Sequence, residues 1–369
     1  MKIICKKSDL LESVNIVLKA VPSKSTMPIL ECLIIEVKND IIKLIANDME
    51  LGIETIVKGN IIEEGTIAIN AKLFSEIIRK LPDNDVNIDS DSNYLATITC
   101  EKSKFTLSGR SGDEFPYLPK IERQGAVVLS QFSLKEVIRQ TVFSISDNES
   151  NKIMTGELFE ISGNEMKVVS LDGHRISIRK LTLHDSYNHI KVIVPGKTLN
   201  EVSKILSGEI SDEVRLFFTD KHILFEFNDT IVLSRLIEGE YYKINQMLSS
   251  DYETKVTVNK KELLNSIDRA TLLIKETEKK PIIVKIEDKN MELKMNSSIG
   301  SMDEEIEISK EGKDILIGFN PKFLIEALRV IDDEEIFIYL INPKAPCFIR
   351  DKDETYIYLI LPVNFNAGI

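Results

Sequence analysis

Hydrophobic positions along the chain follow two periods. Six segments carry apolar residues at three- and four-residue spacing, as Leu73, Ile77 and Leu81 do, which is the period of an amphipathic helix. The stretches 41–46, 213–218 and 335–340 alternate residue by residue and are rich in β-branched and aromatic residues, which favours strands. Because both kinds of segment alternate along the chain, the pattern predicts an α+β fold.

The predicted helices recur at a fixed interval. Segments 70–76, 195–201 and 320–326 each place a Lys third and a Glu seventh, and the three lysines, Lys72, Lys197 and Lys322, are separated twice by 125 residues. A second set of helix starts, at 7–11, 134–138 and 260–264, shares an acidic residue. A chance repeat would not match Lys and Glu in three copies. We therefore expect three tandem, topologically similar domains, at residues 1–122, 128–249 and 252–369, each with many strands and two helices.

The composition is that of a folded protein with more than one core. The chain has 369 residues, 43% of them hydrophobic and 29% charged, and no apolar run reaches the ~18 residues of a membrane span. We therefore expect a cytoplasmic protein that is neither secreted nor membrane-bound. The four cysteines, Cys5, Cys32, Cys100 and Cys347, form no CxxC pair, which favours buried, reduced thiols over disulfides or zinc.

Charge is unevenly distributed along the chain. The net charge of −12 argues against a nucleic-acid partner, which usually requires a basic surface. However, the helical segments 6–24, 70–81, 133–146, 195–206, 259–275 and 320–331 together hold 17 Lys and Arg against eight Asp and Glu. This segregation fits basic helices that face a polyanion and an acidic exterior, although Lys also collects on solvated helices because it is a good helix former.

The sequence offers little support for base-specific binding or for catalysis. It contains no helix-turn-helix or zinc finger, so any contact with DNA should be to phosphates and should weaken with salt. His174 next to Asp172 could be interpreted as a general base, but residues so close in sequence rarely have the required geometry. No nucleophile elbow, Walker loop or HExxH motif is present. We expect no catalytic residues, no metal and no cofactor, and interpret His174 and Arg175 as residues that order a turn.

Four short motifs resemble one known family. Thr26–Leu30 (TMPIL), Ser111–Pro116 (SGDEFP), Leu171–Arg175 (LDGHR) and the ending Tyr358–Val363 (YLILPV) are similar to signature stretches of the bacterial DNA polymerase III beta subunit, the replicative DNA sliding clamp. The likeness extends over the full length and agrees with the repeat.

The resemblance implies a non-catalytic processivity factor with the DNA clamp fold. Two chains of three domains would join head to tail into a ring, with two helices per domain inside and antiparallel sheets outside. The ring would encircle double-stranded DNA without sequence specificity and tether the replicative DNA polymerase catalytic subunit. The resemblance also implies further binding partners: a clamp loader, and repair polymerases and mismatch-repair proteins that bind through short peptide motifs.

The resemblance and the repeat also assign residues to three surfaces. The residues expected at DNA are basic: Lys24, Lys72, Arg79, Lys80, Lys135, Arg139, Lys197, Lys204, Lys261, Lys322 and Arg329. The residues expected at a partner-peptide pocket are mostly apolar: Leu171, Gly173, His174, Arg175, Ile176, Tyr242, Met247, Leu359, Leu361, Pro362 and Val363. The residues expected at the dimer interface are Lys102, Lys104, Phe105 and Leu107 on one chain and Leu272, Leu273, Asp303, Glu304 and Glu305 on the other.

The sequence departs from the family at a few of these positions. Tyr241-Tyr242 replaces the usual Phe-Pro, Gln246 stands where a basic residue is common, and Asn364 replaces an Arg. Gly196 also stands where a basic residue is frequent. These differences leave a second interpretation open, in which the chain is a specialised clamp paralogue or interaction scaffold with weakened DNA loading.

Overall fold

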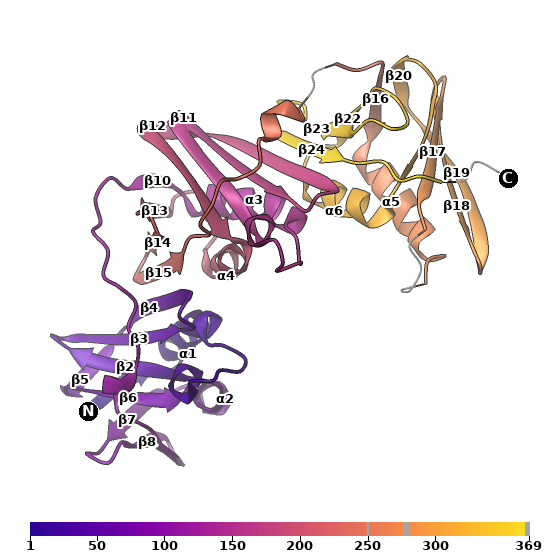
Figure 1. Cartoon of the computed structure of the whole chain (residues 1–369). Coiled ribbons are helices and arrows are strands. Elements are labelled where there is room, and N and C mark those ends of the chain that lie inside the picture. The colour runs from indigo at the N-terminus through magenta and orange to yellow at the C-terminus, as the bar shows by residue number, and fades with distance from the viewer. Residues whose placement is uncertain (249–250, 276–279, 366–369) are drawn as a thin grey trace. The chain divides into compact units, whose positions relative to one another are not determined.

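The computed structural model describes residues 1–248, 251–275 and 280–365. The chain forms two compact units (Figure 1), which we call the first unit, Met1–Leu134 with Glu201–Leu236, and the second unit, Lys135–Asn200 with Ile237–Ile369. The expected domain ends at 249 and 369 lie outside the described residues, and the three expected domain ranges stay a prediction. None of the helices in the described chain has the length and apolar character needed to cross a membrane.

The first unit contains two antiparallel sheets. Its five-stranded sheet has the order β5-β1-β7-β8-β9, and its eight-stranded sheet has the order β10-β13-β14-β15-β4-β3-β2-β6. The strands are β1 (Lys2–Lys6), β2 (Cys32–Lys38), β3 (Ile41–Asn47), β4 (Leu51–Val57), β5 (Gly59–Glu63), β6 (Gly65–Asn70), β7 (Asp85–Ser90), β8 (Leu95–Cys100), β9 (Ser103–Ser108), β10 (Val127–Ser130), β13 (Glu213–Phe218), β14 (His222–Phe227) and β15 (Thr230–Arg235).

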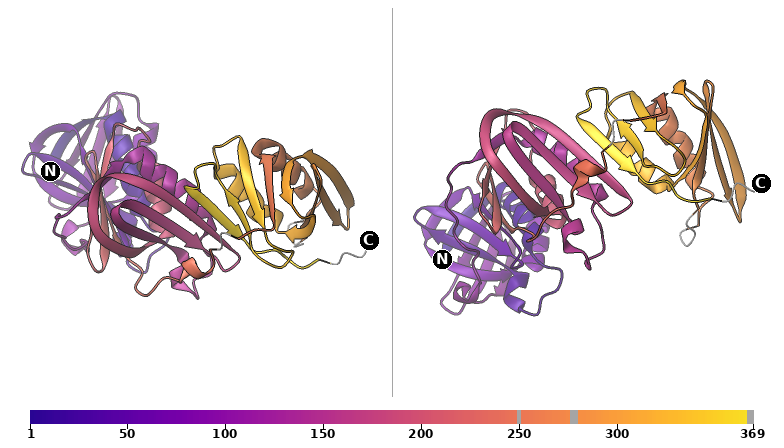
Figure 2. Two further views of the ribbon diagram at one scale, coloured as in Figure 1. Left: turned by 90° about the horizontal axis from the view of Figure 1, so that it is seen from above. Right: turned by 45° about the horizontal axis from the view of Figure 1, so that its top comes forward.

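The described part of the second unit also forms two antiparallel sheets. Its seven-stranded sheet has the order β11-β12-β24-β23-β22-β16-β20, and its four-stranded sheet has the order β19-β18-β17-β21. Strands β11 and β12 form a long hairpin that is visible in both views of Figure 2. The strands are β11 (Gly156–Leu171), β12 (Arg175–Pro195), β16 (Thr254–Asn259), β17 (Ile282–Glu287), β18 (Asn290–Ser297), β19 (Gly300–Glu307), β20 (Ser309–Gly312), β21 (Ile315–Phe319), β22 (Glu335–Leu340), β23 (Cys347–Arg350) and β24 (Tyr356–Ile360).

The described residues form six α-helices where the apolar periodicity predicts them. They are α1 (Lys7–Val17), α2 (Ala71–Lys80), α3 (Gln131–Thr141), α4 (Gly196–Ile205), α5 (Lys260–Thr271) and α6 (Pro321–Val330). Three are shorter than the segments 6–24, 133–146 and 259–275, because the chain passes into a 3-10 turn after α1 and α3 and into a turn after α5. The predicted strands at 213–218 and 335–340 have the same bounds in the structure, and the stretch 41–46 lies within β3.

An asparagine caps the start of three helices: Asn70 and Asn320 at matched positions of the repeat, and Asn259 before the other helix of the third repeat. The side chain of Asn70 accepts a hydrogen bond from the Leu73 amide, and Asn259 and Asn320 cap α5 and α6 in the same manner. An Asn at the N-cap satisfies a backbone N–H that has no partner within the helix. The apolar faces then pack on sheets: α1 on β3 and β4, α2 on β2 and β6, and α5 on β18 and β19.

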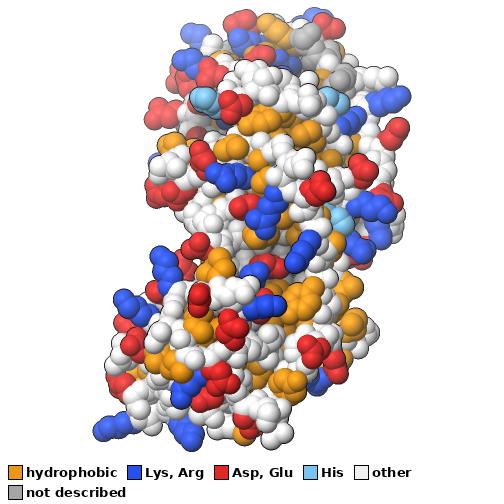
Figure 3. All heavy atoms as spheres, turned by 90° about the vertical axis from the view of Figure 1, so that its left-hand side faces the viewer, with side chains coloured by type: hydrophobic (Ala, Val, Ile, Leu, Met, Phe, Trp, Pro, Cys, Tyr) orange, Lys and Arg blue, Asp and Glu red, His pale blue; other side chains and the backbone are white. Residues whose placement is uncertain are grey.

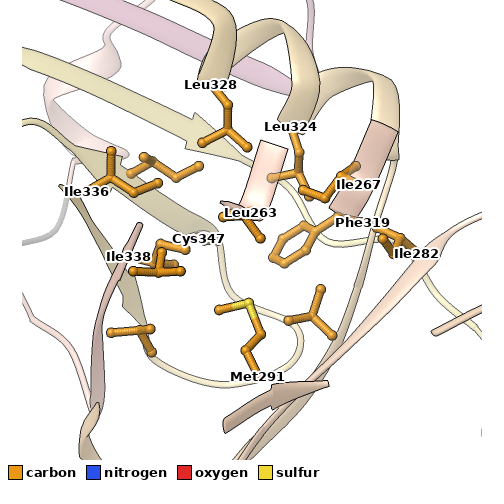
Figure 4. Close-up of a cluster of buried hydrophobic side chains, with 14 of the residues drawn as sticks. Leu263, Ile267, Ile282, Met291, Phe319, Leu324, Leu328, Ile336, Ile338 and Cys347 are labelled. Carbon is orange, nitrogen blue, oxygen red and sulfur yellow. The ribbon is translucent and has the colours of Figure 1, made fainter. Parts of the chain in front are cut away.

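Hydrophobic side chains from helices and sheets meet in closed cores. The largest described cluster lies in the second unit, where Leu263 and Leu324 of α5 and α6 face Met291 and Ile338 of the surrounding strands (Figure 4). All four cysteines are free and buried, as the sequence predicts. Burial raises the pKa of the Cys5 thiol to about 12, because the thiolate would lose its hydration there.

Sheets run from one sequence repeat into the next. In the first unit, β15 of the second repeat pairs with β4 of the first, with Leu233 opposite Gly52. In the second unit, β24 of the third repeat pairs with β12 of the second, with Leu359 opposite Ile176. The middle repeat is therefore divided between the two compact units, because its strands extend sheets that belong to both neighbours.

Candidate functional site

The LDGHR motif forms the tight turn between β11 and β12. Gly173 has a φ of +89°, which a residue without a Cβ adopts at little cost. The Asp172 carboxylate accepts hydrogen bonds from the backbone amides of His174, at 2.9 Å, and Arg175, at 3.2 Å. Asp172 is therefore committed to the backbone of the turn, and the exposed His174 ring instead stacks on Phe323 with ring centroids 6.2 Å apart.

Arg175 fixes this turn to helix α6. Its buried guanidinium forms ion pairs with Asp172 at 2.9 Å and with Glu326 of α6, and donates to the Phe143 carbonyl at 2.7 Å. It also lies 4.3 Å from the centre of the Phe323 ring. A buried charge needs this many partners to offset its lost hydration. Arg175 thus contacts the turn through Asp172 and helix α6 through Glu326.

A second hydrophobic cluster underlies the turn and forms the floor of the expected peptide pocket. Leu171, Ile176 and Leu359 are each at most 5% exposed and pack with Tyr241 and Ile244. The Tyr241 hydroxyl donates to the Val169 carbonyl at 3.2 Å, which satisfies its buried oxygen. Although Tyr241-Tyr242 replaces the family's Phe-Pro, Tyr241 still places an aromatic ring in this buried cluster.

The remaining residues expected at the pocket are exposed or half-buried. Met247 is 51% exposed, and Tyr242, Leu361 and Val363 are 37–38% exposed, while Pro362 is half-buried. The C-terminal strand positions its residues by donating from the Leu361 amide to the His174 carbonyl at 2.9 Å. Leu361 therefore lies beside the turn, whereas the Val363 amide donates to the Gly318 carbonyl of β21 at 2.9 Å.

Basic residues expected at DNA occupy exposed positions on several helices. Lys72, Arg79 and Lys80 lie on α2, Lys197 and Lys204 on α4, Lys261 on α5, and Lys322 and Arg329 on α6; Lys24 lies in the loop after α1. Lys24, Lys80 and Lys261 are exposed and form no salt bridge within the described part of the chain. The surface drawn in Figure 3, by contrast, mixes Lys and Arg with Asp and Glu.

Several of the expected DNA contacts are already neutralised by acidic neighbours. Arg139 of α3 pairs with Glu136 and with Asp332, the latter at 2.8 Å, and both carboxylates raise the pKa of the guanidinium. Lys204 and Arg329 pair with Glu201 at 2.8 Å and Asp268 at 3.2 Å. The basic excess on the six α-helices, 13 Lys and Arg against eight Asp and Glu, is also smaller than the longer segments indicated. Arg139 and Lys135, which are only half-exposed, are the weakest members of the set.

Two strands of the expected dimer interface stand at the edges of their sheets. Strand β9 carries Lys104, Phe105 and Leu107 at the edge of the five-stranded sheet, directly after Lys102 in its turn. Strand β19 carries Asp303, Glu304 and Glu305 at the edge of the four-stranded sheet. Phe105 is 40% exposed and Leu272, after α5, is 78% exposed. An edge strand leaves a row of backbone hydrogen-bonding groups available for another chain.

Glu304 differs from its two acidic neighbours on β19. Its carboxylate accepts hydrogen bonds from Arg269 and Ser266 of α5, and the Arg269 guanidinium holds its pKa below the usual range. Asp303 and Glu305 point to the opposite face of the strand, because side chains alternate along β-structure. Asp303 and Glu305 are therefore better placed than Glu304 to meet a partner's lysines.

The sequence interpretation did not identify four side chains that build this region. Phe143, Phe323 and Glu326 surround Arg175, and the Asn151 amide donates to the Tyr242 hydroxyl at 2.6 Å. Only Glu326 had a signal, since it is the matched Glu of the third repeat. The others contact the motif through space and share no spacing with it.

Comparisons with known proteins agree with this description. The N-terminal, central and C-terminal domain models of the DNA polymerase III beta subunit match residues 1–119, 128–243 and 245–364. The beta sliding clamps of Bacillus subtilis and Staphylococcus aureus are 36% and 34% identical over 98% of this chain and 99% of theirs. The fold is similar to crystal structures of a DNA polymerase III beta subunit from Eubacterium rectale (TM-score 0.97, 63% identity, 100% of both chains) and of the B. subtilis clamp (TM-score 0.96, 35% identity, 99% of this chain and 100% of that one).

Proposed function

The chain belongs to the DNA polymerase III beta subunit family of DNA sliding clamps, and we propose that two copies close head to tail into a ring around duplex DNA. The family is non-catalytic, and the three tandem clamp domains of this chain are similar along their whole length to its members. The single observation that carries the proposal is the pattern of strand pairing between repeats.

Successive repeats are joined by equivalent strands. In the first repeat, β4 is the strand that follows the second hairpin turn, and it pairs with β15, the last strand of the second repeat. In the same way, β12 of the second repeat pairs with β24, the last strand of the third repeat. The equivalent strands that have no such partner within the described part of the chain are β19 of the third repeat and β9, the last strand of the first repeat. Both lie at the edges of their sheets. Pairing β19 of one chain with β9 of another would repeat the junction and close a symmetric head-to-tail dimer.

The repeat also supplies a register for that junction. The turns before β4 and β19 close alike, since the Asp48 amide bonds to the Leu51 carbonyl and Ser297 pairs with Gly300. Ser301 is therefore equivalent to Gly52. The turns before β15 and β9 each contain two residues, so Thr106 is equivalent to Leu233. Because Leu233 pairs with Gly52, we place Thr106 opposite Ser301 of the second chain.

This register gives chemically matched neighbours on both faces of the junction. Lys104 lies opposite Asp303 and Lys102 opposite Glu305, on the face turned away from α5. Phe105 lies opposite Met302, on the face where Met302 already packs on the core of the second unit. Leu107 lies opposite Gly300, and the Leu273 side chain lies directly over Gly300. Opposite charges and apolar pairs directly across antiparallel strands stabilise a sheet.

A charge exchange tests the ring and its register together. Light scattering over a dilution series should give a mass of about two chains for the wild type and a mass approaching one chain for Lys104→Glu. Adding Asp303→Lys to that variant should restore the dimer, because the pair is exchanged rather than broken. Glu304→Lys, one residue away, is the matched control and should not restore it, because position 304 faces α5.

Two results would count against the proposal. A wild type that stays monomeric at every concentration would contradict the ring. Restoration by Glu304→Lys as complete as that by Asp303→Lys would contradict the register while leaving dimerisation in place.

We place DNA against the helices of the ring, with contacts to phosphates rather than bases. The exposed Lys72, Lys80, Lys261 and Lys322 support this placement, and the excess of positive charge on the helices suits a polyanion. The binding free energy of these phosphate contacts should be small, so the long residence time of the protein on DNA comes from its encirclement of the duplex. Loaded protein should stay on circular DNA and leave after the DNA is linearised; release from the intact circle would instead favour a specialised paralogue without stable loading.

We assign the floor of Leu171, Ile176 and Leu359 and the exposed apolar side chains around it to partner peptides. One site would then serve several partners: the replicative polymerase, the clamp loader, repair polymerases and mismatch-repair proteins. We propose that the protein binds these partners in the cytoplasm. Met247→Asp should weaken binding of a polymerase C-terminal peptide about tenfold or more without changing the dimer mass, because it puts a charge on an apolar contact.

A further inference from the structure

The first unit contains a cleft of about 500 Å³ that none of the three surfaces above uses. Its floor is the face of the eight-stranded sheet where β4 meets β15, with Ile45, Ile231 and Leu233 as apolar lining. Residues 118–123, in the segment between β9 and β10, form one wall. This volume is within the usual range for ligand sites, roughly 300 to 1,000 Å³.

The wall is held in place by specific contacts. The Leu118 side chain sits on Gly52, so closely that a Cβ at position 52 would lie 1.9 Å from Leu118 Cδ1. The Asn47 amide donates to the Pro116 carbonyl at 2.7 Å, and Leu118 and Ile121 pack against the cluster of Phe217, Leu224 and Leu233. The cleft is therefore already formed without a ligand, which lowers the ordering cost of binding.

The polar part of the lining is basic. Lys43, Lys120 and Arg123 line the cleft with a single acid, Glu54, whereas the chain as a whole has a net charge of −12. Lys43 pairs with Glu54 at 3.1 Å, and Arg123 pairs with Glu226 at 3.3 Å. Lys120 is exposed and forms no salt bridge among the described residues. Since Lys43 and Arg123 are each paired with one acid, Lys120 adds an uncompensated positive charge at the cleft, which favours an anionic ligand over a cationic one.

The wall also has backbone groups available for pairing. Residues 117–124 belong to no helix, strand or turn, and no described backbone-to-backbone hydrogen bond involves residues 117–126. An open backbone next to an apolar floor is the combination that captures an extended peptide, whose main chain pairs while alternate side chains enter the floor.

We propose that this cleft binds an extended acidic peptide segment that places an apolar side chain on Ile45, Ile231 and Leu233. The acidic residues on either side would meet Lys120 and Arg123 at the rim. The occupant is a partner protein's segment, and the site is distinct from the proposed ring junction, DNA surface and peptide pocket, since it shares no residue with them.

The test uses the full-length protein labelled at Ile and Leu methyl groups and an acetylated Glu-Glu-Val-Tyr-Glu amide peptide as the probe. We expect saturable NMR shifts at the methyls of Ile45, Ile121, Ile231 and Leu233. The double variant Lys120→Glu/Arg123→Glu should raise the Kd at least about tenfold. The matched control Lys221→Glu/Lys289→Glu makes the same charge change at exposed positions outside the cleft and should leave the Kd unchanged.

Four results would overturn the proposal. The peptide could leave these methyls unshifted, or it could shift only the methyls of Leu171, Ile176 and Leu359. Both double variants could weaken it equally, which would mean that only net charge matters. A 12-nucleotide single-stranded DNA that shifts the cleft methyls where the peptide does not would assign the cleft to nucleic acid.

Discussion

The Thr141 hydroxyl oxygen lies 3.0 Å from Oε2 of Glu157, and both side chains are fully buried in the second unit. The same hydroxyl lies 2.7 Å from the Val137 carbonyl. The hydroxyl has a single hydrogen, which it can donate to Glu157 or to the Val137 carbonyl, so at most one of the two acceptors is fully satisfied. Burial raises the pKa of Glu157 well above its usual value, and the hydrogen bond from Thr141 offsets only part of this rise, so the neutral acid is favoured in the core.

A neutral Glu157 makes stability depend on pH. The unfolded chain loses this proton above about pH 4 while the folded chain keeps it, so the stabilisation present below that pH is lost as pH rises toward the raised pKa. Glu157→Gln keeps the size of the side chain and a carbonyl oxygen that can accept from Thr141, and it cannot ionise. Between about pH 4 and the raised pKa, the unfolding free energy of Glu157→Gln should therefore rise relative to that of the wild type by up to about 1.4 kcal/mol per pH unit. Denaturant titrations at several pH values would measure this difference.

Glu160 on the same strand provides a control with the opposite sign. Lys167 forms an ion pair with it and lowers its pKa, so its contribution is present above the unfolded pKa and is lost as pH falls. Glu160→Gln should then lose stability relative to the wild type at neutral pH and lose little at pH 3. Parallel curves for Glu157→Gln and the wild type would show that Glu157 is not neutral in the fold.

Removing Arg175 should strongly destabilise the second unit. Arg175→Ala leaves Asp172 and Glu326 without their shared cation, and breaking a buried ion pair on one side costs about 3 to 5 kcal/mol. Arg175→Lys should recover little, because an ammonium cannot reach both carboxylates and the Phe143 carbonyl with a planar fork. Thermal unfolding would measure the loss, and an unchanged midpoint for either variant would contradict the assigned role.

Gly52 should tolerate no side chain while Leu118 is in place. Gly52→Ala would drive the new methyl into Leu118, and overpacking of this kind costs about 1 to 3 kcal/mol. Leu118→Ala should be destabilising alone yet relieve part of the cost of Gly52→Ala, which a double-mutant cycle would detect as a coupling energy. Additive effects would mean that the two residues do not contact each other in solution.

The four cysteines should be unreactive in the folded protein. The thiolate is the reactive form, and burial raises the pKa of Cys5 and Cys32 while removing access. A colorimetric thiol reagent at pH 8 should modify close to none of them within minutes and all four in denaturant. Rapid reaction of any one before unfolding would contradict its burial.

Much of the fold followed from local patterns in the sequence. Helix positions came from apolar spacing around residues such as Leu73 and Leu324, and the strand at 213–218 came from alternation, because both periods are set by backbone geometry within one element. The repeat of Lys72, Lys197 and Lys322 showed that the same unit recurs. Motif recognition gave the family and the turn at Asp172–Arg175.

Only the tertiary structure decided which distant residues meet. The pairing of β15 with β4, the ion pair of Arg175 with Glu326 across 151 residues, and the seat of Leu118 on Gly52 join elements that no periodicity relates. Helices α1 and α5 also end at residues 17 and 271, earlier than the apolar spacing predicts, so Lys24 lies in a loop. Local sequence determines the form of an element, whereas its partners depend on which edges and apolar faces remain to be covered when all the elements pack together.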